Sequence, residues 1–174
     1  TFTPIDEIDR IAQKVMQERL ETSLALHDSG EKFSVWSVLV SPVSEMRSIF
    51  EIAPHESDED FSNITSRLSK LGDAFDSWVE TIESTSAKGK YVARRQVEGV
   101  IEQLESQANG GYSSMAKRFD GEGKYPELHI QALVAESACK KLANYLRDSY
   151  LPKAANVDGV GAERYAMWAR NYTG

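Results

Sequence analysis

Apolar residues along most of the chain recur at steps of three and four, the spacing typical of amphipathic helices. The first pattern predicts a helix that begins at Thr3 and Pro4, which suit the N-cap and the first helical position. It ends at the turn residues 28–30. We expect its apolar stripe to be buried; the members are Ile5, Ile8, Ala12, Val15, Met16, Leu20 and Leu24.

Residues 33–40 are apolar and β-branched, but no second run of that kind exists to pair with them as a strand. We interpret this segment as irregular chain or a short helix. Ser41 and Pro42 then predict the start of a helix that Pro54 ends.

The strongest periodic pattern follows an acidic capping signature at residues 57–60. It covers residues 61–82 and predicts either one long helix or two helices joined near Gly72. Later patterns predict helices over 93–108, 126–150 and 160–172, with a short piece over 112–119. We therefore expect an all-α fold, an irregular antiparallel bundle of about six to eight helices in one domain over residues 1–174.

Composition excludes several classes of protein. The 174 residues are 41% hydrophobic, enough for one core without a metal or disulfide staple. A mean hydropathy of −0.44 and the absence of a long apolar run exclude a membrane span. The net charge of −7 argues against a nucleic-acid partner. The first residues show no signal peptide, so we expect a cytoplasmic protein.

The histidines do not form a recognisable metal motif. His55 lies four residues before Glu59, but Ser57 caps the helix between them, so the two side chains do not share a helical face. His129 lies near Glu127 and Glu136, yet the Glu-x-x-His spacing of helical di-metal sites is missing.

Other chemical groups are equally isolated. Cys139, the only cysteine, cannot form an internal disulfide and is typical of a small buried apolar residue. No Gly-x-Ser-x-Gly or phosphate-binding glycine motif occurs. The basic residues at 88, 90, 94 and 95 indicate a solvated helix start rather than an anion site. We therefore predict no catalytic, cofactor-binding or metal-ligating residue in this chain.

The last predicted helix carries an aromatic face formed by Tyr165, Trp168 and Tyr172. The chain begins without a methionine and stops just after this face, so we expect a piece of a longer protein. The aromatic face then has two open interpretations: part of the core, or a surface that meets the rest of the protein.

Several passages resemble a known family. Residues 150–155 read Tyr-Leu-Pro-Lys-Ala-Ala, and residues 161–168 contain Gly-Ala-Glu-Arg-Tyr-Ala-Met-Trp. Together with Ser41-Pro42 and the run 89–104, they resemble the N-terminal part of the bacterial domain-of-unknown-function 885 family, whose members are similar to zinc-dependent metallopeptidases.

The resemblance implies a mostly helical fold and a His-Glu-x-x-His-like motif in a later portion of the protein, where zinc is expected. It implies that this chain is the N-terminal helical domain, inactive alone, with the C-terminal catalytic region as partner and a peptide as the substrate of the intact protein. The residues we expect to meet that region or line its cleft are Arg164, Tyr165, Trp168 and Arg170.

Two alternatives stay open. One is a free-standing helical interaction or scaffold domain that binds a partner through its last helix. The other is a small acid/base enzyme that uses His129 with Glu127 or Glu136.

Overall fold

A computed structural model describes residues 3–34 and 36–173 and confirms the all-α prediction. No strand occurs in these two ranges; two residues, Ala93 and Ala155, form one isolated parallel bridge. The helices are α1 (Glu7–Asp28), α2 (Glu31–Ser34), α3 (Pro42–Glu51), α4 (Asp58–Ser69), α5 (Leu71–Ala87), α6 (Arg94–Ala108), α7 (Gly111–Phe119), α8 (Pro126–Tyr145) and α9 (Gly161–Thr173).

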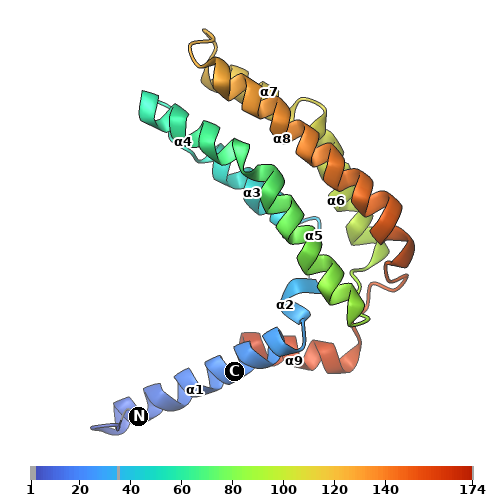
Figure 1. Cartoon of the computed structure of the whole chain (residues 1–174). Coiled ribbons are helices and arrows are strands. Elements are labelled where there is room, and N and C mark those ends of the chain that lie inside the picture. The colour runs from blue at the N-terminus through green and yellow to red at the C-terminus, as the bar shows by residue number, and fades with distance from the viewer. Residues whose placement is uncertain (1–2, 35, 174) are drawn as a thin grey trace.

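Helix α8 is the centre of the bundle and packs against α4, α5, α6 and α7 (Figure 1). Its inward face carries small side chains at steps of three and four between Leu128 and Leu142, and these small residues allow the neighbouring helices to approach closely. All of them are fully buried: Ala132, Ala135, Cys139 and Ala143.

Local capping chemistry fixes the starts of two helices as the sequence predicts. The Ser57 hydroxyl accepts from the Asp60 N–H, and the Asp60 carboxylate accepts from the Ser57 N–H, which forms a reciprocal capping box on α4. Ser41 caps α3 in the same way, with Pro42 in its first turn. The pattern over 61–82 forms two helices, which meet at Lys70.

Helices α1 and α9 run antiparallel beside each other and project away from the bundle (Figure 1). We call this pair the arm. Helix α2 lies between the arm and α5.

The arm contradicts two expectations about the first helix. Asp6, whose carboxylate accepts from the Asp9 N–H, caps the helix in place of Thr3, because Pro4 and Ile5 stay outside it. The apolar stripe from Ile5 to Leu24 is exposed rather than buried. Within α1 only Thr22 and Leu26 are buried, since α9 covers only the second half of α1.

The segment predicted as irregular or a short helix begins in α2 and, from Trp36, continues as an irregular connection with a bend at residues 38–40, where the Ser37 N–H donates to the Val40 carbonyl oxygen at 2.8 Å; Val35 lies outside the described residues. Beyond it, Trp36 packs edge-on against Trp78 of α5, with ring centroids 4.8 Å apart. The Val38 N–H donates a hydrogen bond to the Gln96 side chain of α6, and the Val38 carbonyl oxygen accepts one from the Gln103 side chain. These contacts join the connection to the bundle.

Helix α8 ends in a change of helical pitch. A π-helical turn, Leu146–Tyr150, follows it directly and leads into a short 3₁₀ turn, Leu151–Lys153, that contains Pro152. The Tyr150 hydroxyl accepts from the Val92 N–H at 3.0 Å, which holds this end against the strand-like residues before α6.

No helix in the described ranges combines the length and the apolarity needed to cross a bilayer.

Candidate functional site

A buried carboxylate, Glu31, joins the arm to the bundle. Its fully buried side chain accepts from Lys90 Nζ at 3.0 Å, Arg164 Nε at 2.7 Å and Trp168 Nε1 at 3.3 Å. Burial raises the pKa of this carboxyl, but the Arg164 and Lys90 donors outweigh burial, so the pKa lies below its usual range. Three segments far apart in the sequence therefore meet at one charged group.

The four predicted docking residues lie on α9, but they do not act as one group. Arg164 and Trp168 face inward to Glu31. Arg170 pairs with Glu18 of α1 at 3.1 Å. Tyr165 is 68% exposed. Three of these side chains thus assemble the arm, and Tyr165 remains on its surface.

The outer surface of the arm carries an apolar groove of about 670 Å³ along α1. Its apolar members Met16, Leu20 and Leu24 are between 58% and 65% exposed. Polar side chains border it, among them Asp9 and Glu21. An apolar row of this length on a helix is typical of a surface that binds another protein segment.

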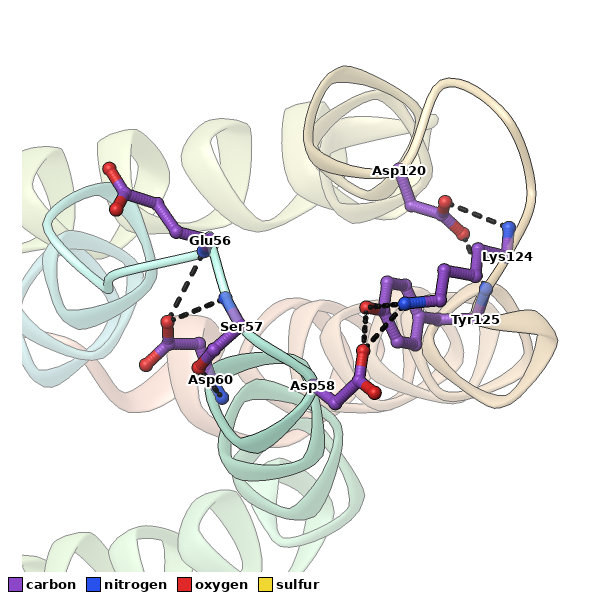
Figure 2. A network of polar contacts seen from close by, with 7 residues as sticks. All are labelled: Glu56, Ser57, Asp58, Asp60, Asp120, Lys124 and Tyr125. Carbon is purple, nitrogen blue, oxygen red and sulfur yellow. Dashed lines mark hydrogen bonds and ion pairs between the residues drawn. The ribbon is translucent and has the colours of Figure 1, made fainter.

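Acidic side chains gather at the opposite end of the bundle, where the start of α4 meets the loop before α8 (Figure 2). Asp58 accepts from Lys124 Nζ at 2.6 Å and from the Tyr125 hydroxyl. Asp60 serves the capping box. Asp120 accepts from the backbone N–H groups of Lys124 and Tyr125 at 2.9 and 2.8 Å. Asp60 and Asp120 thus stabilise their own cap and loop, and Asp58 links the start of α4 to the loop before α8.

His129 belongs to this end, and its partner differs from the predicted ones. Its Nε2 lies 3.1 Å from Asp120 Oδ2. Glu127 binds Gln131, and Glu136 is buried and accepts from the Ser113 N–H at 2.6 Å. The acid/base pairing of His129 with either glutamate is therefore wrong, because Glu127 and Glu136 are engaged elsewhere.

Asp120 is nearly fully buried. Burial raises the pKa of its carboxyl, yet the Tyr125 and Lys124 N–H groups, together with His129, lower the pKa below its usual value. The carboxylate of Asp120 closes the loop 120–125 and orients the start of α8.

His55 and Glu59 do not share a site either. The His55 ring stacks on Phe119, with centroids 4.0 Å apart, and its Nδ1 lies 3.1 Å from the Ala53 carbonyl oxygen. Over residues 3–34 and 36–173, no group of three or more histidine, cysteine, aspartate and glutamate side chains is arranged to hold a metal ion.

Cys139 is fully buried in α8, and burial, with a smaller effect of Glu136, raises the pKa of its thiol to about 12. The thiol is therefore protonated and shielded from solvent. The predicted basic cluster is divided among separate partners: Lys90 pairs with Glu31 and Arg95 with Asp158. It forms no common anion site.

The sequence did not reveal that Glu31 joins the arm to the bundle or that Asp120 closes the loop before α8. Glu31 follows a glycine turn like many exposed acids, and Arg164, its partner, lies 133 residues away. Asp120 stands in a glycine-rich turn, where an aspartate is ordinary.

A comparison with family profiles matches residues 2–174 to the family described as "Bacterial protein of unknown function (DUF885)". A search of the curated proteins finds no match to the chain.

Proposed function

Since the chain belongs to the DUF885 family, we propose that it is the N-terminal helical domain of a zinc-dependent, metallopeptidase-like protein. The metal ligands lie in another region of that protein, and the arm packs against that region. The domain has a structural role: it shapes the approach of a peptide to the zinc site and performs no chemistry itself.

The exposed apolar groove on α1 carries this proposal. Met16, Leu20 and Leu24 form a row on a helix of 22 residues, and such rows in globular proteins are normally buried against another element. On α9, Tyr165 and Tyr172 are 68% and 79% exposed and offer further aromatic area.

The arm is also built to hold its position. The Glu31 contacts join α2, α9 and the loop before α6, and Arg19 of α1 donates to the carbonyl oxygens of Arg170 and Asn171 at 2.9 and 2.7 Å. A docking surface held in this way loses little conformational entropy on binding.

The zinc ion supplies the chemistry when bound in the other region: it polarises the peptide carbonyl and activates the attacking water. This chain alone should bind zinc no more tightly than about micromolar affinity, because residues 3–34 and 36–173 present no convergent ligand set. Isothermal titration calorimetry measures this affinity, and tight stoichiometric binding by this chain contradicts the proposed division of roles.

The docking role is tested in the whole protein with Leu20→Glu. We expect a loss of peptidase activity of tenfold or more with zinc content unchanged, because a charge in the groove separates the arm from the zinc-binding region. The matched control is Ile130→Glu on α8, another exposed apolar position, 52% exposed. Equal activities of the two variants contradict the proposal.

A free-standing interaction domain uses the same groove. The reading frame distinguishes the two functions: a continuation that encodes a His-Glu zinc motif supports the peptidase-like protein, whereas its absence supports the interaction domain.

A further inference from the structure

The first half of α1 carries a second apolar face, distinct from the groove around Leu20. Ile8, Ile11 and Val15 lie at steps of three and four and are 76%, 54% and 57% exposed. Every residue from 10 to 17 is exposed. Further along the same helical face, Thr22 and Leu26 are buried where α1 meets α9 and α2. The exposed face therefore continues an interface that already binds a helix.

The bundle offers a groove that suits such a helix. It lies between α3, α4 and α5 and has a volume of about 500 Å³. Its apolar lining consists of Met46, Ile49, Phe50, Leu71 and Ala74, of which Ile49 is 44% exposed. A groove of this kind accepts an amphipathic helix through side chains at three- and four-residue steps.

The charges of the two surfaces are opposite. Arg67 and Lys70 border the groove, and no carboxylate among the described residues forms an ion pair with Arg67. The start of α1 carries Asp6, Glu7 and Asp9 against the cations Arg10 and Lys14, a net charge of −1, and Glu7 pairs with Arg10. Each chain has a net charge of −7, which makes two copies repel each other. At physiological salt this repulsion is screened beyond about 8 Å, so the opposite charges that lie close together at the contact determine the pairing.

We propose that the first half of α1 binds the α3–α5 groove of a second copy of this chain. Two copies exchange their α1 helices reciprocally and form a closed twofold dimer. Ile8, Ile11 and Val15 enter the groove, and the acids at the start of α1 lie beside Arg67 and Lys70. Figure 1 shows these first turns projecting away from the bundle of their own chain, as exchange requires.

Sedimentation velocity from about 1 to about 200 μM tests the dimer, a range that brackets micromolar affinities. We expect the mass to double with concentration, and Ile8→Asp to raise the dissociation constant tenfold or more. Ile130→Asp, the same change at an exposed site on α8, leaves it unchanged. A monomer at all concentrations, or equal effects of the two substitutions, overturns the proposal.

Charge reversal tests the pairing. Arg67→Glu should weaken the dimer, and adding Glu7→Lys should restore it at least in part, whereas Glu7→Lys with Lys140→Glu on α8 should not. Lack of recovery in the first pair overturns the assigned orientation.

A cysteine pair tests the contact directly. A mixture of Ile8→Cys and Ala74→Cys proteins should form a disulfide-linked heterodimer on oxidation, visible on a non-reducing gel, with far less linkage in either protein alone. The native Cys139 is buried and does not compete. Absence of the heterodimer overturns the proposal. The dimer and the packing of the arm against the zinc-binding region are tested by different variants. Substitutions at Ile8 and Arg67 test the dimer, whereas Leu20→Glu and zinc titration test the proposed function.

Discussion

A single buried acid determines how the arm sits on the bundle. Glu31 is fully buried, while its cationic partners Lys90 and Arg164 keep 27% and 32% of their side-chain surface exposed. The two cations satisfy the carboxylate from two directions, and the Trp168 indole adds a third donor. Removal of the acid leaves two cations that regain water, whereas removal of a cation leaves a buried charge with less compensation.

Glu31→Gln should lower the free energy of unfolding by about 2 kcal/mol. This loss is below the roughly 3–5 kcal/mol typical of a broken buried ion pair, because Lys90 and Arg164 are partly exposed and regain water. Urea unfolding measures it. The exposed Glu45→Gln should change stability by less than about 0.5 kcal/mol, and a similar change in both variants contradicts the role of Glu31.

The lowered pKa values of Glu31 and Asp120 predict acid sensitivity. The unfolded chain binds protons at these groups more readily than the folded chain does, so their contribution is present above the unfolded pKa of about 4 and is lost as pH falls through the folded pKa. Urea midpoints should fall below about pH 5, less steeply in Glu31→Gln. An identical pH dependence in the variant contradicts this assignment.

At the scale of elements, α8 shows how small side chains set helix spacing. Ala132, Ala135 and Ala143 are buried with Cys139 on one face, and α4 to α7 pack around that helix. Leu128 and Leu142 fill the wider spaces on this face, whereas the alanine positions leave no room for larger side chains, since protein interiors are close-packed.

Ala135→Leu should therefore lower the free energy of unfolding by about 1–3 kcal/mol through overpacking. Lys140→Leu, on the exposed side of the same helix, is the matched control with a comparable helix propensity. Thermal unfolding distinguishes them, and equal melting temperatures contradict close packing at Ala135.

The elements also show what sequence patterns determine. The caps at Ser41 and Ser57 were predictable because their partners lie three residues away. The alternative of one or two helices over 61–82 is resolved as two helices that meet at Lys70, two residues before the Gly72 at which the sequence suggested a junction. Periodicity identified the apolar face of α1 correctly but gave no information on what covers it, so its predicted burial was wrong.

At the scale of the whole molecule, the chain divides into a bundle around α8 and an arm that buries few hydrophobic residues and is joined to the bundle through the contacts of Glu31 (Figure 1). The bundle contains nearly all of the buried hydrophobic residues, whereas α1 contributes Leu26 and α9 contributes none. Local stability follows buried contacts, so the two parts should open independently.

Hydrogen–deuterium exchange should follow this division. Amides of residues 10–17 should exchange fastest among helical amides, and those of α8 slowest, with a protection difference of at least a hundredfold. Self-association through α1 should slow the exchange of residues 10–17 at high protein concentration. Uniform protection across α1 and α8 in the monomer contradicts the division.

The arm also marks the limit of prediction for the site. The sequence placed Trp168 and Tyr165 on a helix and left open whether they pack inside or face a partner. In the structure Trp168 donates to Glu31, whereas Tyr165 is exposed. Glu31 comes close to Arg164 and Trp168 only because the chain between them folds around the bundle. Contacts over such separations have no local signature.

The π-helical turn at residues 146–150 fixes the direction in which the Tyr150 side chain leaves the end of α8. A π turn holds one more residue than an α turn, and each residue of a helix rotates the chain by about 100°. Deletion of Ser149 would let α8 continue as a regular helix, yet it would turn Tyr150 away from the Val92 N–H that its hydroxyl now accepts from. Insertions and deletions in this turn thus separate the end of α8 from the residues before α6 while the helix itself stays regular.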